Sequence, residues 1–219
     1  MGLLGDRPLG FVVRNAVRPA NYAAVMRGLR CYPRPADAIG RYLFGRGAYP
    51  HDVAVRTPEG KIAIRLYSAH DMITVNEVFA RRDYACPPAT RTVVDIGSNI
   101  GISALYFLTR GPAVRCILYE PDPRNVARLR ENLHGREDRY ELHEAAVADR
   151  AGDLEFGVET FGRYGGLGAQ TGETITVACR HINGVLEDAL AGTDVIDVLK
   201  IDTEGAERAT LDAIRPDLL

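Results

Sequence analysis

The feature that most constrains the fold is a strand, turn, helix and strand pattern near the middle of the chain. The apolar run Thr92–Gly97 contains an acid, Asp95, and enters the glycine-bearing turn Gly97–Gly101. A helix pattern over Asn99–Leu108 follows, and a second apolar run, Cys116–Glu120, ends in another acid. This order predicts a βαβ unit with parallel strands, which binds ligands at the carboxyl ends of its strands.

The details of the turn distinguish between two kinds of nucleoside cofactor. A dinucleotide fingerprint needs a second glycine, so that the backbone can approach a pyrophosphate, but Asn99 occupies that position. Asp95 would repel a pyrophosphate and suits the cationic, phosphate-free S-adenosylmethionine (SAM). Glu120 ends the next strand, where a carboxylate can accept both ribose hydroxyls. A glycine turn without a ligand is the alternative; otherwise the predicted SAM-binding residues are Asp95, Gly97, Ser98, Asn99, Gly101 and Glu120.

Two further strand ends contribute polar groups to the same rim. Glu144, Ala145 and Ala146 lie at one strand end, where main-chain N–H groups and apolar side chains could hold an adenine. Asp202 and Glu204 follow another and would lie beside the methyl group, where they could orient or deprotonate an acceptor hydroxyl. The alternative for this last pair is capping of a helix N-terminus, and both roles can hold together.

Other candidate residues carry weaker signals. Tyr84 could close over the cofactor, or it is an ordinary half-buried tyrosine. His70 and Asp71 precede a short helix, where a cap is a stronger interpretation than catalysis. Asp202 and Glu204 alone do not form the oxygen cluster that a divalent metal requires, so we predict no metal.

The pattern before residue 90 predicts an extension of short helices and one hairpin. Eight of the 12 prolines lie there, which argues against regular alternation of strands and helices. Short helices are predicted at Pro19–Arg30 and Ala36–Phe44, a hairpin around Thr57–Gly60, and a capping box at Thr74–Glu77. We therefore divide the chain into an extension at 1–90 and an α/β core at 91–219.

The rest of the core alternates between strand and helix patterns. Val195–Ile201 is almost continuously apolar, which is typical of a parallel strand buried on both faces. The glycine-rich loop Gly157–Gly172, with Arg163 and Tyr164, could be a lid or a plain mobile loop. The other predicted elements are a helix at Asp122–His134, a strand at Tyr140–Val147, hairpin arms at Leu154–Val158 and Ile175–Ala178, and a helix at Ile182–Leu190.

Composition excludes several classes of protein. A net charge of −2 gives no reason to expect a nucleic-acid partner, and no window is long and apolar enough to span a membrane. The four cysteines are widely spaced and form no metal or redox motif. A reducing, cytoplasmic compartment is the simplest interpretation.

The motifs as a set resemble those of the FkbM family of SAM-dependent methyltransferases. Generic methyltransferases do not share the stretch Leu199–Glu207, and Ser98 stands where the family more often has alanine. The other matching segments are Val94–Gly101, Tyr119–Pro123, Ala145–Val147, His70–Met72, Glu77–Phe79 and Tyr84. The resemblance covers roughly residues 65 to 215 and implies a Rossmann-like α/β sheet. It also implies O-methylation of a sugar, polyketide or similar natural product, a small hydroxylated acceptor.

One departure from the family pattern concerns the end of the sheet. Family members usually continue with further strands, whereas this sequence stops at Leu219. We therefore expect Val195–Ile201 to be an exposed sheet edge, able to pair in a homodimer. A non-catalytic or truncated SAM-binding partner subunit is the alternative function, and Asn99 and Asp95 disfavour a third, an NAD(P)-dependent oxidoreductase.

Overall fold

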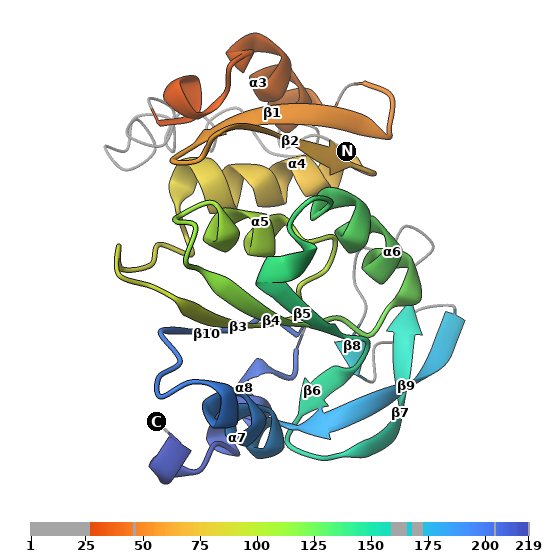
Figure 1. Cartoon of the computed structure of the whole chain (residues 1–219). Helices are drawn as coiled ribbons and strands as arrows, with labels where there is room; N and C mark the ends of the chain where they lie inside the picture. The colour runs from red at the N-terminus through yellow and green to blue at the C-terminus, as the bar shows by residue number, and fades with distance from the viewer. Residues whose placement is uncertain (1–26, 46, 159–165, 168–172, 204, 219) are drawn as a thin grey trace, which may run out of the picture. The chain divides into compact units, whose positions relative to one another are not determined.

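The computed structural model describes residues 27–45, 47–158, 166–167, 173–203 and 205–218 (Figure 1). The chain divides into two compact units, Met1–Ala85 and Cys86–Leu219. Most of the predicted helix Pro19–Arg30 falls outside the described residues, although residues 27–31 are helical. No helix in the described ranges has the length and apolar character needed to cross a membrane.

The N-terminal unit contains the predicted hairpin. Strands β1 (His51–Thr57) and β2 (Gly60–Leu66) pair antiparallel, with Thr57 opposite Gly60 at the turn. Alternate apolar side chains on the two strands are buried, as the periodicity indicates. The other elements of this unit are α3 (Pro35–Phe44), α4 (Ala69–Val75) and the π-helix η1 (Asn76–Arg81).

The capping box of this unit lies earlier in the chain than predicted. Helix α4 begins after Ser68, whose hydroxyl accepts from the Asp71 N–H, while the Asp71 carboxylate accepts from the Ser68 N–H at 2.9 Å. The prediction that Thr74 opens the helix is wrong, because Thr74 lies inside α4. Asp71 is the third residue of α4 and belongs to this capping box, whereas the sequence pattern placed it and His70 before the helix.

The C-terminal unit is built on a parallel sheet with strand order β10-β3-β4-β5. The chain runs outward from β3 through β4 to β5 and then returns to the far side of β3 as β10. The switch point of the topology therefore lies between β3 and β10, where open α/β sheets bind ligands at the carboxyl ends of the strands. The strands are β3 (Thr92–Ile96), β4 (Arg115–Tyr119), β5 (Tyr140–His143) and β10 (Val198–Ile201).

Helices lie on both faces of this sheet (Figure 1). Helices α5 (Ile102–Leu108) and α6 (Pro123–Asn132) lie on one face, with α7 (Ile182–Gly192) and α8 (Glu207–Asp212) on the other. The predicted cap of α6 is confirmed, since the Asp122 carboxylate accepts from the Arg124 N–H at 2.8 Å. The fold is therefore the predicted Rossmann-like α/β class, with a helix and hairpin unit before it.

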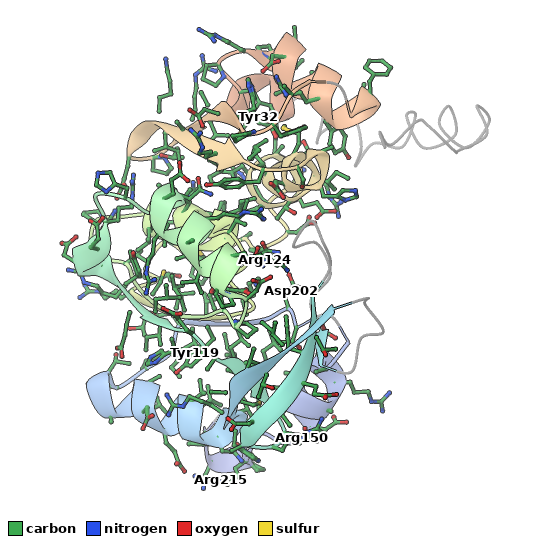
Figure 2. The ribbon with its side chains drawn as sticks, turned by 90° about the vertical axis from the view of Figure 1, so that its right-hand side faces the viewer. Tyr32, Tyr119, Arg124, Arg150, Asp202 and Arg215 are labelled. Carbon is green, nitrogen blue, oxygen red and sulfur yellow. The ribbon has the colours of Figure 1, made fainter. Side chains whose placement is uncertain are left out.

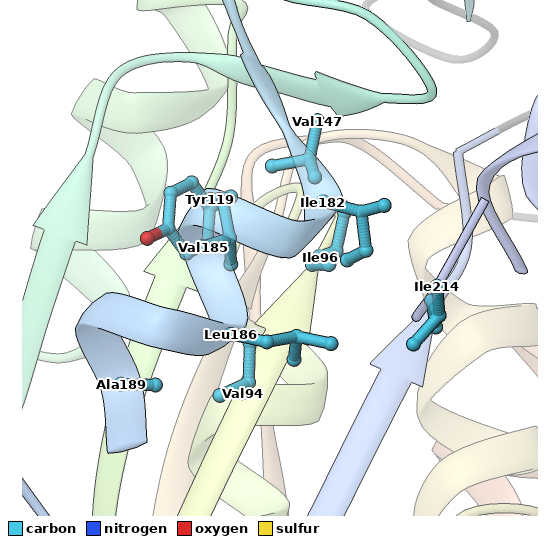
Figure 3. Close-up of a cluster of buried hydrophobic side chains, with 9 residues drawn as sticks. All are labelled: Val94, Ile96, Tyr119, Val147, Ile182, Val185, Leu186, Ala189 and Ile214. Carbon is cyan, nitrogen blue, oxygen red and sulfur yellow. The ribbon is translucent and has the colours of Figure 1, made fainter. Parts of the chain in front are cut away.

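The hydrophobic core between the sheet and α7 shows which strand side chains point toward α7 and which point to the opposite face. Figure 3 shows Val94, Ile96 and Tyr119 of β3 and β4 packed with Ile182 and Leu186 of α7. Because strand side chains alternate, the residue between the two β3 members, Asp95, points to the opposite face, toward α5.

A second sheet, with strand order β6-β9-β7-β8, corrects one predicted strand. The predicted strand Tyr140–Val147 is broken: β5 ends at His143, and β6 (Ala146–Ala148) pairs with β9 (Glu173–His181). Because β6 pairs with the long β9, residues Ala146–Ala148 belong to a different sheet from β5. The apolar pattern alone does not show which strand they pair with. The predicted hairpin is confirmed by β7 (Gly152–Val158) and β9; β8 (Gly166–Leu167) lies in its loop, while Arg163 and Tyr164 fall outside the described residues.

Strand β10 is shorter and more exposed than predicted. It begins after Asp197, whose carboxylate accepts from the N–H groups of Arg91 and Thr92 at 2.7 and 2.8 Å. Within β10 only Lys200 is buried, and Val195, which precedes it, is 58% exposed. Burial on both faces is thus a wrong prediction, because among the described strands β10 has β3 as its one neighbour.

Candidate functional site

The carboxyl ends of β3, β4 and β10 bring three of the predicted site segments together. The N–H groups of Gly97 and Ser98 donate to the Tyr119 carbonyl at 2.9 and 3.0 Å. The Asp202 N–H donates to the Ile96 carbonyl at 3.1 Å. The turn after β3 therefore lies between Glu120 and Asp202, as the sequence predicts.

Every backbone N–H of the turn 97–101 has an acceptor within the protein. After Gly97 and Ser98, the Asn99 N–H donates to Glu120 Oε2 at 2.8 Å, and the Ile100 N–H donates to Asn99 Oδ1 at 2.7 Å. The Gly101 N–H donates to the Ser98 carbonyl at 2.9 Å. Anion binding at a helix N-terminus needs N–H groups that point at the ligand. The turn is therefore not arranged to hold a pyrophosphate.

Packing explains the two glycines of the turn. Gly97 has φ +79°, and a Cβ there would lie 2.0 Å from the Asp202 carbonyl oxygen. Gly101 has φ +84°, and its Cβ would lie 3.2 Å from Leu129 Cγ of α6. Both positions need glycine for the folded turn itself, whatever ligand it holds.

The Glu120 carboxylate is nearly enclosed at 4% exposure and holds the turn to the loop after β4. In addition to Asn99, its donors are the Asp122 N–H at 2.9 Å and Asn125 Nδ2 at 3.4 Å. Burial raises the pKa of Glu120 to about 7, although the hydrogen bonds from Asp122, Asn99 and Asn125 oppose that shift. This carboxyl group therefore changes charge near neutral pH.

A buried lysine is the main functional candidate that the sequence interpretation missed. Lys200 Nζ lies 2.8 Å from Oδ1 of the fully buried Asp95 and donates to the Gly97 carbonyl at 2.8 Å. Ser103 of α5 donates to the other Asp95 oxygen at 2.6 Å. The available signal was that Lys200 stands within an apolar strand and that Lys61 is the only other lysine in the sequence.

Asp202 is the accessible carboxylate of this cluster. Figure 2 labels this side chain in the stick view. It is 52% exposed, and its Oδ2 lies 3.8 Å from Lys200 Nζ. Helix α8 begins after Ala206, so Asp202 is not its N-cap. Glu207 instead accepts from the N–H groups of Thr203 and Gly205, at 2.9 and 3.0 Å. The capping interpretation therefore does not account for Asp202.

The remaining predicted residues are less directly placed. Ser98 is buried and donates to the Asp95 carbonyl at 2.8 Å, and the half-exposed Glu144 pairs with Arg130 at 2.7 Å. Ala145 and Ala146 are buried where β6 begins. Tyr84 belongs to the N-terminal unit, and Glu204 falls outside the described residues, so the roles of both stay predictions. The described residues contain no cluster that could hold a metal ion.

Comparison with known proteins places this Rossmann-like chain in a family. Residues 95–218, more than half of the chain, match the Methyltransferase FkbM domain. The chain therefore belongs to the FkbM methyltransferase family.

Three similar proteins carry related names. The 2-O-methyltransferase NoeI of Sinorhizobium fredii is 45% identical over 64 residues, which are 29% of this chain and 26% of NoeI. The 31-O-demethyl-FK506 methyltransferase FkbM of Streptomyces tacrolimicus is 26% identical over 194 residues, 72% of this chain and 74% of that protein. A crystal structure of a methyltransferase FkbM from Methylobacillus flagellatus KT aligns over 93% of this chain and 45% of its own, at 15% identity and a TM-score of 0.39. The chain thus spans about a quarter of NoeI and under half of that crystallised chain.

Proposed function

We propose that the chain binds SAM at the carboxyl ends of β3, β4 and β10 and transfers its methyl group to a hydroxyl of a small molecule. The observation that carries this proposal is the turn 97–101, whose N–H groups are all engaged while carboxylates lie on both sides of it. Such a site suits a cationic nucleoside without phosphates. NoeI and the Streptomyces FkbM are both named as O-methyltransferases, which supports a hydroxyl as the methylated group. A sugar, polyketide or related natural product is the proposed acceptor.

In this proposal Glu120 binds the ribose of the cofactor. A carboxylate has about four lone-pair sites, and three donors now address the two oxygens of Glu120. One lone-pair site is therefore available to a ribose hydroxyl. A second ribose hydroxyl can replace the long hydrogen bond from Asn125. The other proposed cofactor contacts are Tyr84, Gly97, Ser98, Asn99, Gly101, Glu144, Ala145 and Ala146. Asp95, which the sequence also predicts, is fully buried and is proposed to support the turn from within rather than to contact the cofactor.

Asp202, with Glu204, is proposed to address the acceptor hydroxyl. SAM supplies an electrophilic methyl group, and the acceptor oxygen must be held in line with it at roughly 3–3.5 Å. Asp202 is half-exposed beside the turn, so its carboxylate can accept the hydroxyl proton while the oxygen attacks.

Replacing this carboxylate is expected to slow turnover far more than it weakens SAM binding. Asp202→Asn should lower kcat about 10²-fold, because base assistance and alignment are lost together. Asp138→Asn, on the exposed 3-10 helix η2 (Glu137–Arg139), is the matched control and should keep wild-type kcat. If both variants turn over a methyl acceptor at the wild-type rate, the acceptor base is a residue other than Asp202.

A thermal-shift series tests the proposed cofactor against the alternatives. SAM and S-adenosylhomocysteine should both raise the melting temperature of the chain, and NAD should not. A shift with NAD alone would support the oxidoreductase instead. A shift with SAM but no methyl transfer to any hydroxylated acceptor would support a non-catalytic partner subunit.

The exposed edge of β10 is proposed to pair with the same edge of a second copy. Among the described strands, β10 has a neighbour on one side only, and the preceding Val195 is exposed. Sedimentation of the chain at micromolar concentration should therefore show a dimer. Val195→Lys should shift the population to monomer, because a lysine at a strand edge opposes pairing with another chain. A wild-type monomer at that concentration would contradict this interface.

The cytoplasm is proposed as the compartment of this chain. All four cysteines are free thiols, and Cys31, Cys116 and Cys179 are buried. Thiols without disulfide partners are typical of proteins from reducing compartments.

A further inference from the structure

The ammonium of Lys200 joins three parts of the candidate site. Its register partner across the sheet is Asp95, and the two charged groups form an ion pair at 2.8 Å. The same nitrogen donates to the carbonyls of Gly97 at 2.8 Å and Ile96 at 3.4 Å, which are the first turn residue and the last residue of β3. Asp202 Oδ2 lies 3.8 Å from the same nitrogen.

The buried charges of Lys200 and Asp95 require each other as partners. The Lys200 side chain is 6% exposed and that of Asp95 is 0% exposed, and buried charges persist only when they are paired and hydrogen-bonded. The ammonium donates to the carbonyls of Gly97 and Ile96, and its charge is balanced by the ion pair with Asp95. The first carbonyl of the turn is therefore held by a charge-assisted hydrogen bond from a different strand.

We propose that Lys200 is a positioning residue for the cofactor turn, and that it neutralises Asp95 so that Asp202 supplies the negative charge met by a cationic cofactor. This inference rests on the proposed SAM function and deepens it. Asp95 has no exposed surface, and its two oxygens are addressed by Lys200 and Ser103. Asp202 is half-exposed and lies at the same rim.

A paired substitution separates positioning from simple stability. Lys200→Met alone leaves Asp95 buried without its counter-ion and is expected to fold poorly. The double variant Asp95→Asn/Lys200→Met removes the charges together, and its Asn still accepts from Ser103, so its melting temperature should stay near that of wild type. Its affinity for SAM in calorimetry should nevertheless fall at least tenfold, because the Gly97 carbonyl has lost the hydrogen bond from Lys200 that positions the turn. Lys61→Met, at the exposed start of β2, is the matched control and should bind as wild type does.

Comparison of SAM with S-adenosylhomocysteine tests which carboxylate meets the positive charge. The two ligands differ by the methyl group and the sulfonium charge. The double variant should weaken both ligands equally, leaving the ratio of their affinities within twofold of wild type. Asp202→Asn should shift that ratio severalfold against SAM.

Each outcome has a definite meaning. A folded double variant that binds SAM within twofold of wild type overturns the positioning role, and a ratio that shifts in the double variant but not in Asp202→Asn overturns the assignment of charge. Wild-type chain that binds neither ligand overturns the proposed function itself, and this inference with it.

A spectroscopic readout checks that the lysine responds to the cofactor. The sequence has two lysines, so chain labelled with ¹³C-lysine gives two side-chain Cε–H signals in NMR, each next to its ammonium. Titration with SAM should shift the Lys200 signal and leave that of Lys61 unchanged. A Lys200 signal that stays in place at saturating SAM would contradict the positioning role.

Discussion

Gly97→Ala is expected to lower the free energy of unfolding by roughly 2–5 kcal/mol, the largest loss of stability from adding one methyl group in this site. Two effects add. An L-residue at φ +79° is strained, and the new Cβ would lie 2.0 Å from the Asp202 carbonyl oxygen. That oxygen belongs to backbone at the end of β10, so it cannot swing aside as a flexible side chain would.

A second glycine offers a matched control for this prediction. Gly135 has the same φ of +79°, but a Cβ there would meet nothing within 4 Å. Gly135→Ala should therefore lower the free energy of unfolding only through backbone strain, by about 1–2 kcal/mol. Urea unfolding of both variants measures the two losses of unfolding free energy, and their difference reports the contact between the turn and the Asp202 carbonyl. Equal losses in the two variants would show that this contact is absent.

The affinity for SAM is expected to fall about tenfold between pH 8 and pH 6, because the pKa of Glu120 is about 7. Ribose hydroxyls donate to the ionised carboxylate, and protonation of Glu120 removes that acceptor. Glu120→Gln should bind SAM more weakly and without this dependence on pH. Calorimetry should measure the SAM affinity of both proteins at both pH values. Because the titration of SAM itself affects both proteins equally, the difference between their pH dependences reports Glu120 alone. Parallel pH profiles for the two proteins would refute the assignment.

The same carboxyl group should affect the stability of the ligand-free chain in the opposite direction. Burial raises the pKa of Glu120 from 4.5 in the unfolded chain to about 7, so between these pH values the folded chain binds the extra proton. Its contribution to stability is therefore complete below pH 4.5 and is lost as the pH rises through 7. SAM binding and apo stability thus respond oppositely to pH through one residue.

Local signals made much of the fold predictable. Two-residue alternation identified the hairpin, and Asp122 before Pro123 located the start of α6. The acid, turn and second acid lie close along the chain, so their convergence followed from the βαβ topology. The cap of α4 was misplaced because two capping patterns lie six residues apart along the chain, and the helix begins at the first of them, after Ser68.

Contacts between distant segments were not predictable in this way. The contact between Lys200 and Gly97 joins residues more than 100 positions apart, and only the return of the chain to the far side of β3 creates it. The collision that keeps Gly97 a glycine has the same origin, so the sequence interpretation assigned that glycine to the ligand alone. The break between β5 and β6 likewise depends on a partner strand, β9, that comes later in the chain.

The central claim, that SAM binds beside Glu120, is tested most directly by calorimetry at pH 8 with SAM as the titrant. We expect saturable binding to wild type and an affinity roughly 10- to 150-fold lower for Glu120→Ala, since hydrogen bonds to a charged group are worth about 1.5–3 kcal/mol. Glu155→Ala, at an exposed position of β7, should bind as wild type does. A folded Glu120→Ala variant with unchanged affinity for SAM would contradict the account.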